Sequence, residues 1–560
     1  MGQLRISARA VAITVLVMSC RGRCQEGSVA GGAAGPAAVT SSTHVASRLA
    51  VDCKAPSKTI SPYIYGIAFD ITGTSDGTDP RLWAMNPSGR RMGGNASSRY
   101  NWEEGNVFNS GNDWFFENQT TGKGPEPVWR TFLTANASHH AISAIEIPML
   151  GWVAKDATSV SFPLSRHPSQ QSFDAARGAG NGRLPDGSPL PSDDPALTSI
   201  ESTPAFQARW VRAIKSLAAT TSSPSPRVYI LDNEPTIWSG THRDVHPEPV
   251  GYDELWKLTR EYASAIREAD PDGVIAGPAL WGFTAYMYSG KDTLAGVFFR
   301  PDRRAHDDLP LLAWYLREVA RYQKQTGKKL IDLLDVHFYP AADGIGITTS
   351  GKTDPASNAL RIRATRALWD PTYKDESWIG EPLRLLPRLH EWIDAYDPGL
   401  GIQIGEWSFG AENDMSAGLA VAEALARFAD GGVTSAYYFP SPEIGSAAYF
   451  AFRAYRNFDG RGGRFLDRLA PSDSSGVATL WASRDDAGKH LVLIVLNTDP
   501  AAAEGGGVDL SSCGAVESVR AFAYRRGQAD FSTLDAAPRP GGVAVSFSPY
   551  SISVVDVALR

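Results

Sequence analysis

The chain has 560 residues, too many for one hydrophobic core, so we expect a large domain and at least one smaller one. Hydrophobic residues make up 43% and charged residues 21%, the proportions of a globular protein, which argues against disorder over most of the length. The formal net charge of -7 disfavours a nucleic-acid partner, whereas 15 Trp and 19 Tyr supply flat apolar faces on which sugar rings stack.

The first residues have the pattern of an export signal. Arg5 and Arg9 precede an apolar run that is too short to span a bilayer. Cys20 follows in a sequence similar to a bacterial lipoprotein cleavage box, which would make it the acylated residue of an outer-membrane or cell-surface anchor. We predict a signal peptide over 1–19, a flexible Gly/Ala/Ser tether over 20–47, and a bacterial protein that is either secreted or lipid-anchored.

Short apolar, strand-like runs then recur along the chain with helical patterns between them. The eight runs are residues 65–70, 91–95, 141–150, 228–234, 274–281, 330–340, 402–407 and 434–439. A helical period is clear over 206–217, 252–269 and 311–323. Strand and helix alternating in this way predict an α/β fold, a (β/α)8 TIM barrel, which we place at 59–445.

After the eighth run the pattern contains only strands, at 491–496, 516–524 and 543–557, so we predict an appended all-β sandwich domain over 446–560. Segment 48–58 precedes the first barrel strand and is expected to join that sandwich. This would bring Cys53 near Cys513, and an exported protein permits a disulfide between them. Two separate buried thiols are the alternative.

Two long irregular stretches, 166–203 and 341–379, follow the C-terminal ends of predicted barrel strands. A barrel builds its active site at these ends, so both stretches are candidates for the walls of a cleft. Surface insertions without function would have the same composition.

Two of the strand-like runs carry a glutamate at the last or the next-to-last residue. Pro235 stops the fourth strand just after Glu234, which places Glu234 at the rim. Alternation puts Glu406 on the same face as Ile402 and Ile404, and if that face is the interior, Glu406 points into the barrel mouth. Glycoside hydrolysis needs such a pair, one carboxyl to protonate the leaving oxygen and one to attack the anomeric carbon. For either glutamate alone, a salt bridge or a cap is the alternative.

The sixth run places Asp335, His337 and Tyr339 on one face. Tyr339 could donate a hydrogen bond to Glu406 and keep it ionised, and His337 could reach the acid or the sugar. Buried polar residues that only satisfy one another are the alternative.

Aromatic residues follow several strand ends and are predicted stacking platforms for a polysaccharide. They are Trp152, Trp238, Trp281 and Trp407. His242, Asp244 and His246 have the spacing of a metal site, but the prolines after them disfavour a helix, so we predict no metal there. The aspartates and glycines of 70–79 faintly resemble a calcium loop, for which an ordinary polar loop is the alternative.

Longer motifs resemble glycoside hydrolase family 44, in order from about residue 60 to 460. They are RMGGN at 91–95, SRYNW at 98–102, DWFFEN at 113–118, LDNEP at 231–235, DVHFYP at 335–340, LWDP at 368–371, SWI at 377–379 and GEW at 405–407. The resemblance implies a barrel with a β-sandwich and retaining cleavage of β-1,4-glucans, including xyloglucan. It places the acid/base at Glu234 and the nucleophile at Glu406. Asn233 and Trp102 lie in these motifs, and we expect both to bind substrate. It implies no required cofactor, although some members bind structural calcium.

The first hypothesis is therefore a retaining endo-β-1,4-glucanase that cleaves internal bonds of cellulose-like glucans or xyloglucan by double displacement. We expect a monomer whose partner is the β-glucan polysaccharide. One alternative is a surface glycan-binding lipoprotein without catalysis. The other is the same mechanism acting on mannan or xylan.

Overall fold

The computed structural model describes residues 48–560 except 70, 72–76, 111–114, 122–125 and 348–350. The predicted signal peptide and tether, with Cys20, lie outside the described residues, and so does most of the loop weighed as a calcium site. In the part of the chain that is described, no helix is both long enough and apolar enough to cross a membrane.

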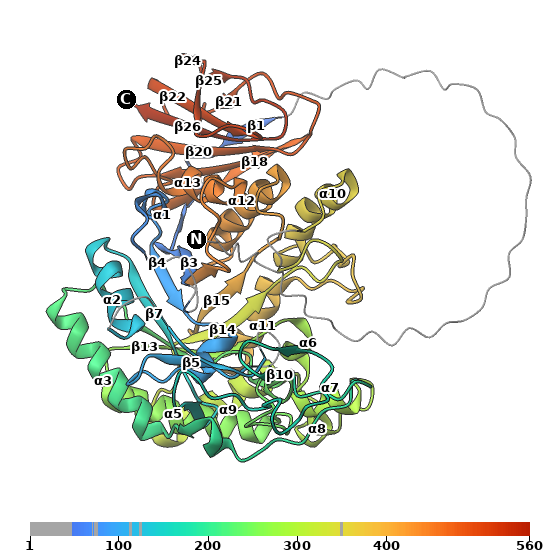
Figure 1. Cartoon of the computed structure of the whole chain (residues 1–560). Helices are drawn as coiled ribbons and strands as arrows, with labels where there is room; N and C mark the ends of the chain where they lie inside the picture. The colour runs from blue at the N-terminus through green and yellow to red at the C-terminus, as the bar shows by residue number, and fades with distance from the viewer. Residues whose placement is uncertain (1–47, 70, 72–76, 111–114, 122–125, 348–350) are drawn as a thin grey trace, which may run out of the picture.

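Eight parallel strands close into a barrel in the order β12, β13, β14, β15, β16, β3, β4, β7 (Figure 1). Their bounds are β3 Tyr63–Phe69, β4 Gly89–Met92, β7 Ile142–Ile147, β12 Val228–Leu231, β13 Val274–Leu280, β14 Leu333–Phe338, β15 Gly401–Trp407 and β16 Ser435–Tyr438. Each strand overlaps the apolar run predicted at its place in the chain, so the predicted barrel is confirmed.

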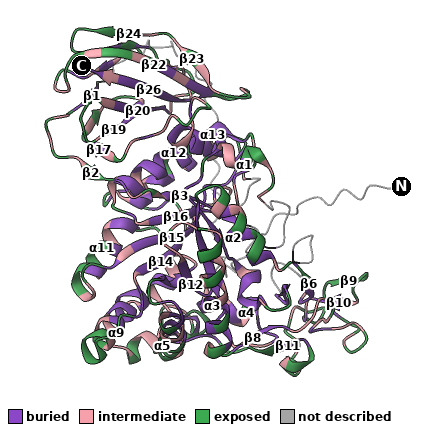
Figure 2. Cartoon of the chain, turned by 90° about the vertical axis from the view of Figure 1, so that its left-hand side faces the viewer, coloured by how far each residue is buried: buried purple, intermediate pink, exposed green. Residues whose placement is uncertain are grey.

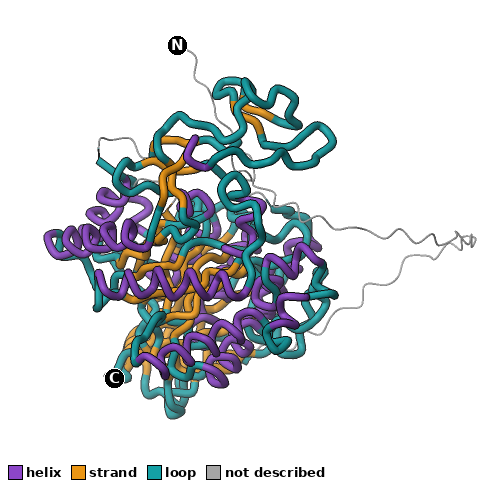
Figure 3. Tube along the Cα trace, turned by 90° about the horizontal axis from the view of Figure 1, so that it is seen from below, coloured by secondary structure: helices purple, strands orange, loops and turns teal. Residues whose placement is uncertain are grey.

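Helices surround these strands (Figure 3). The longer ones are α2 Val128–Ser138, α3 Pro204–Thr220, α5 Tyr252–Ala269, α9 Leu311–Thr326, α10 Pro355–Ala364, α11 Leu385–Tyr396, α12 Met415–Asp430 and α13 Ala447–Arg456. Helix α3 shows why they form: Thr203 caps its first turn, Pro204 occupies the first helical position, and the apolar face buries Trp210 and Ile214. Figure 2 shows the buried faces of the helices turned toward the strands.

Short elements lie in the connections between the barrel strands. They are α1 Pro80–Ala84, η1 Asn95–Arg99, β5 Asn106–Phe108, β6 Asn118–Thr120, β8 Trp152–Ala154, β9 Phe173–Asp174, β10 Ala179–Gly180, η2 Pro195–Leu197, β11 Ser199–Glu201, η3 Pro235–Ile237, α4 Trp238–Thr241, α6 Phe283–Met287, α7 Gly290–Ala295, α8 Pro301–Ala305 and η4 Thr365–Leu368. The stretch 166–203 holds β9 and β10, and its strand β11 pairs with β8 just after β7, which places it beside the barrel mouth.

The C-terminal part is a sandwich of two sheets, as predicted. One has the order β2, β17, β19, β20, β26, β22, β23, and the other β18, β1, β21, β25, β24. The bounds are β1 Leu49–Val51, β2 Lys58–Thr59, β17 Arg468–Ala470, β18 Ser472–Ser474, β19 Ala478–Arg484, β20 His490–Asn497, β21 Val508–Asp509, β22 Val516–Arg525, β23 Ser532–Leu534, β24 Ala536–Arg539, β25 Gly542–Val545 and β26 Ser551–Leu559. The single strand predicted over 543–557 is wrong: Pro549 and Tyr550, whose φ is 47°, interrupt it, and its halves lie in different sheets.

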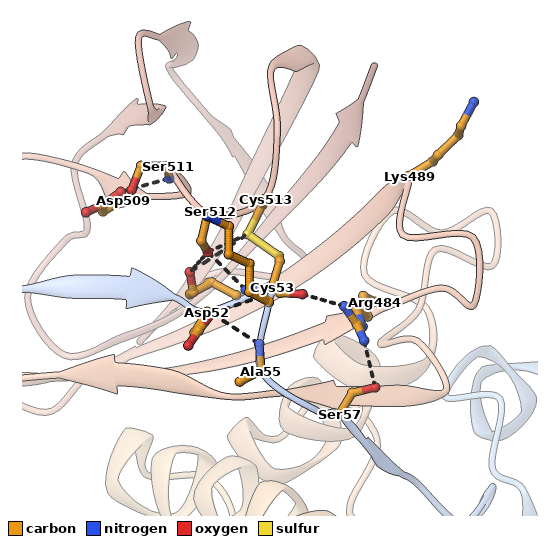
Figure 4. Close-up of a disulfide and its surroundings, with 12 residues drawn as sticks. Asp52, Cys53, Ala55, Ser57, Arg484, Lys489, Asp509, Ser511, Ser512 and Cys513 are labelled. Atoms are coloured by element: carbon orange, nitrogen blue, oxygen red, sulfur yellow. Dashed lines mark hydrogen bonds between the residues drawn. A yellow bond between two sulfur atoms is a disulfide. The ribbon is translucent and has the colours of Figure 1, made fainter.

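The N-terminal segment belongs to the sandwich, because β1 pairs with β18 and β21. A disulfide joins Cys53 to Cys513, with the two Cα atoms 4.9 Å apart (Figure 4). Ser512 supports the link by accepting a hydrogen bond from the Cys53 amide at 3.0 Å. The alternative of two separate buried thiols is therefore wrong.

Candidate active site

Glu234 and Glu406 meet at the C-terminal end of the barrel strands. One carboxylate oxygen of each, together with a ring nitrogen of His337, lie within 4.8 Å of one another. Both side chains are largely buried, with 13% of Glu234 and 5% of Glu406 exposed. Retaining glycosidases hold their two carboxyl groups about 5 to 5.5 Å apart, and inverting ones about 6.5 to 9.5 Å apart. The separation here fits double displacement.

Glu234 follows β12 in a left-handed backbone conformation, with φ 46° and ψ 51°. A non-glycine residue rarely adopts this region, and such conformations gather at functional sites. Its amide donates to the carbonyl of Ala279, in the neighbouring strand β13, at 3.0 Å. Pro235 then begins η3, so the chain turns away immediately after Glu234 and leaves its side chain at the rim.

Glu406 reaches the interior for a different reason from the one predicted. Ile402 and Ile404 belong to the apolar cluster that the barrel shares with its helices, so they face outward. Gln403, between them, faces the interior and donates to the carboxylate of Asp335 at 2.9 Å. The predicted shared face of Ile402, Ile404 and Glu406 is therefore wrong.

A β-bulge in β15 restores Glu406 to the interior. Ile404 and Glu406 are two residues apart but pair with consecutive residues of β14, Val336 and His337. The extra residue is Gly405, and a Cβ atom there would lie 2.5 Å from a carboxylate oxygen of the barrel interior. The bulge thus depends on a glycine, and it aims Glu406 into the mouth.

Glu406 is surrounded by donors. Arg91 Nη1 donates to Oε1 at 2.7 Å, Tyr339 Oη donates to Oε2 at 2.7 Å, and His337 Nδ1 lies 3.5 Å from Oε2. Burial alone would raise the pKa of this carboxyl, but the charges of His337 and Arg91 and the hydroxyl of Tyr339 lower it below its usual range. Glu406 is therefore held as a carboxylate, as an attacking group requires, and the predicted Tyr339 hydrogen bond is confirmed.

Among the described residues, Glu234 has one hydrogen-bonding partner, His337, whose Nδ1 lies 2.9 Å from its Oε1. Burial raises the pKa of Glu234, and the hydrogen bond and charge of His337 offset this only in part. The pKa of His337 is itself raised by the two carboxylates, against the effect of its own burial. The predicted contact of His337 with the acid is confirmed, and the two glutamates are driven toward opposite protonation states.

Arg91 and Glu146 extend this site, although neither was predicted to have a role in it. Arg91 Nη2 donates to Asn233 Oδ1 at 3.1 Å and lies 3.4 Å from Glu146 Oε2, which also accepts from the Gly94 amide at 2.8 Å. Glu146 is fully enclosed, and burial raises its pKa well above the usual range. For Glu146 the available signal was its place as the one charged residue of the apolar run 141–150, and for Arg91 it was the motif at 91–95.

Asn233 lies at the site, bonded to Arg91. Of the predicted aromatic platforms, Trp102, Trp152 and Trp281 are partly exposed. Residue Glu201 of β11 pairs with Trp152, so the stretch 166–203 stands next to this ring.

Trp238 and Trp407 are 1% and 0% exposed, so the prediction that they stack on sugar is wrong. Trp238 instead donates to the carbonyl of Asn233 at 2.9 Å. Trp407 follows the inward Glu406 and so faces the helices, where it packs edge-on against Phe428. An aromatic that was not chosen, Trp378, is 57% exposed in the stretch after β14.

The histidines weighed as metal ligands do not converge. His246 bonds to Glu254 at 2.9 Å, Asp244 pairs with Arg99 at 3.2 Å, and His242 is fully buried. Among the described residues, the group whose ligand-type atoms do converge is Glu234, His337 and Glu406. There the guanidinium 2.7 Å from Glu406 already supplies the positive charge.

Residues 107–342 match the family model of glycoside hydrolase family 44. Endoglucanase A of Paenibacillus lautus is 32% identical over 463 residues, which cover 78% of this chain and 62% of that relative's own length. Two solved structures superpose over the whole fold. CelM2, a bifunctional glucanase-xylanase from a metagenome library, is 28% identical with a TM-score of 0.84, covering 92% of this chain and 99% of its own.

The second is a Paenibacillus polymyxa xyloglucanase of the same family in complex with xyloglucan. It is 27% identical with a TM-score of 0.74, and the match covers 92% of this chain and 100% of that one. Of the four residues that meet in the barrel mouth, Glu234 and His337 lie within the family-model match, and Arg91 and Glu406 lie outside it. These comparisons make the chain similar to glycoside hydrolase family 44 across both the barrel and the sandwich.

Proposed function

We propose that this chain is a retaining endo-β-1,4-glucanase acting on cellulose-like glucans or xyloglucan. The observation that carries the proposal is the pair of glutamates within 4.8 Å, one whose pKa is lowered and one whose pKa is raised. The similarity to this family and the glucan-cleaving relatives support the substrate class.

In the first step Glu406 attacks the anomeric carbon while Glu234 gives its proton to the departing glycosidic oxygen. The bond to the leaving sugar breaks as the bond from Glu406 forms, which leaves a covalent glycosyl-enzyme. Glu234, now ionised, takes a proton from water, and that water attacks the anomeric carbon and releases Glu406. The two inversions give net retention.

The remaining polar residues prepare these steps. Arg91 and Tyr339 each donate to one oxygen of Glu406, which orients the carboxylate and keeps it ionised. His337, between the glutamates, balances their charge as the proton leaves Glu234. Asn233, Trp102, Trp152 and Trp281 are proposed to bind the sugar chain.

The test is a panel of soluble carboxymethylcellulose, xyloglucan, xylan and mannan, with reducing ends and product sizes measured. We expect internal cleavage of the β-1,4-glucans and retained anomeric configuration by NMR. Cleavage of xylan or mannan alone would indicate the same mechanism acting on a different glycan. Of these two, xylan is the specific candidate, because CelM2 is a glucanase-xylanase. Binding of all four without cleavage would favour the non-catalytic glycan-binding lipoprotein.

We also propose export, supported by the positively charged and apolar start of the sequence and by Cys20. Mass spectrometry of the mature N-terminus in a bacterial host distinguishes the two forms. A lipid-modified Cys20 indicates a surface anchor, and an unmodified N-terminus after it indicates secretion. An uncleaved N-terminus starting at Met1 would contradict both.

A further inference from the structure

A buried arginine outside the carboxylate pair joins two segments that leave the active site. Arg361, on α10, is 0% exposed, and all five of its N–H donors have partners. Its Nε donates to the carbonyl of Phe409 at 2.9 Å. Its Nη2 donates to the carbonyls of Gly344 at 3.2 Å and Lys352 at 2.5 Å. Its Nη1 donates to side-chain oxygens of α10 and α12 at 2.9 and 2.6 Å.

None of these partner atoms is a carboxylate oxygen. The charge of Arg361 is therefore stabilised by neutral oxygens that must all be in place at once. The rigid fork of a guanidinium matches such a fixed set of acceptors, whereas the single ammonium of a lysine has three donors and another shape. The contact is thus sensitive to the relative position of the two backbone segments.

Those segments are the continuations of the two strands that meet at Glu406. Gly344 lies five residues after Tyr339, and Phe409 lies three residues after Glu406. Tyr339 and Glu406 are themselves joined by the 2.7 Å hydrogen bond. The segment after Tyr339 and the segment after Glu406 are therefore connected twice: by the hydrogen bond between these two side chains, and further along by Arg361.

Gly351 shows how closely the same junction is packed. A Cβ atom at Gly351 would lie 2.7 Å from the carbonyl oxygen of Gly344 and 3.3 Å from Nη2 of Arg361. It would also lie 3.2 Å from the backbone nitrogen of Ala411, in the segment after Glu406. Even one methyl group would push the two segments apart, without touching any residue of the carboxylate pair.

We propose that Arg361 is a positioning residue for the hydrolysis, which fixes the segment after Tyr339 against the segment after Glu406 and so sets their hydrogen bond. The inference rests on the proposed function. Arg361 acts through the backbone, because its hydrogen bonds go to none of the charged or titratable groups that face Glu406. Those groups are Arg91, Glu146, Glu234, Asp335, His337 and Tyr339.

The first test is Arg361→Lys, which keeps the positive charge but replaces the planar guanidinium with an ammonium that has fewer donors. We expect kcat on the best glucan to fall about tenfold to a hundredfold with KM nearly unchanged, because the attacking group is misplaced rather than the sugar unbound. The acid limb of the pH profile should move upward by up to about one pH unit, because a weaker Tyr339 hydrogen bond raises the pKa of Glu406. An unchanged kcat and acid limb would overturn the inference.

A double-mutant cycle with Tyr339→Phe separates positioning from general destabilisation. If Arg361 acts through the Tyr339 hydrogen bond, the double variant should be little slower than Tyr339→Phe alone. If the two losses simply multiply, Arg361 acts by another route and the inference is wrong.

Arg363→Lys is the matched control, two residues away on α10, because Arg363 is half-exposed and pairs with Glu376 at 2.8 Å. It should leave kcat and the acid limb unchanged. Gly351→Ala tests the same junction with Arg361 intact and should reproduce the kcat loss, which keeps the inference testable if Arg361→Lys does not fold. A wild-type enzyme inactive on every glycan would defeat the proposed function instead.

Discussion

The ends of β12 and β15 each deliver a glutamate to the same barrel mouth, yet they do so in different ways. At β12 the strand stops, and a left-handed residue followed by proline leaves Glu234 at the rim. At β15 the strand continues through a bulge at Gly405, and Glu406 points inward from within it. Within the described part of the chain, the first carboxyl has one close partner and the second has three, counting His337 at 3.5 Å.

The difference in partners gives identical side chains different chemistry. Glu406 receives a cation and a hydroxyl, which lower its pKa, whereas burial dominates at Glu234 and raises its pKa. Activity requires Glu406 ionised and Glu234 protonated, so it should fall as pH drops through the pKa of Glu406 and fall again as pH rises through that of Glu234. The profile is a bell whose two limbs belong to the coupled pair.

The largest expected effects come from removing each carboxylate in turn. Glu406→Gln should lower kcat on glucan by at least about 10⁴-fold, because no other group can form the covalent intermediate. Glu234→Gln should lower it by about 10²- to 10⁴-fold, because proton donation is lost. On an aryl glycoside whose leaving group needs no proton, Glu234→Gln should recover the first step and Glu406→Gln should not.

Thermal unfolding of both variants is the control. Each substitution leaves a buried partner residue without the opposite charge of the glutamate, which could lower stability as well as activity. Rate measurements on the aryl glycoside decide the assignment. Recovery in Glu406→Gln and not in Glu234→Gln would reverse the two roles, and near-normal glucan cleavage by either variant would contradict the pair altogether.

The positions of the strands could be predicted from the sequence more fully than the directions in which their side chains point. All eight barrel strands were predictable, because a parallel strand covered on both faces is a short apolar run. The side of β15 on which Glu406 lies relative to Ile402 and Ile404 was not predictable. One extra residue at Gly405 reverses the alternation, and such a bulge has no strong local signature in the sequence. Trp407 was misassigned for a different reason: a residue next to an inward one faces the helices, and this follows from alternation alone.

Arg91 and Glu146 were missed because their meaning depends on pairing between distant strands. β4 and β7 lie side by side, with Arg91 opposite Ala144, and only this register brings the guanidinium to Glu146 and across to Glu406. A motif shows that Arg91 is present but not what it touches. The same limit applies to Arg361, three of whose acceptors are backbone carbonyls that any residue could supply.

A smaller effect should come from Arg91, which distinguishes the two carboxylates most directly. Arg91→Met removes the cation 2.7 Å from Glu406, so the pKa of Glu406 should rise. The acid limb of activity then moves to higher pH, while the alkaline limb, set by Glu234, moves little. Arg91→Lys keeps a charge nearby and should shift the limb less. The measurement is kcat/KM against pH for each variant.

Arg99→Met is the matched control, because Arg99 is equally buried and is paired with Asp244 rather than with the glutamates. It should lower thermal stability and leave the acid limb where it is. An equal shift of both limbs in Arg91→Met would mean that Arg91 acts on the pair as a whole. An unmoved acid limb would mean that Tyr339 and His337 alone keep Glu406 ionised. The contrast between the two strand ends would then rest on these two residues at the end of β14 rather than on the cation from β4.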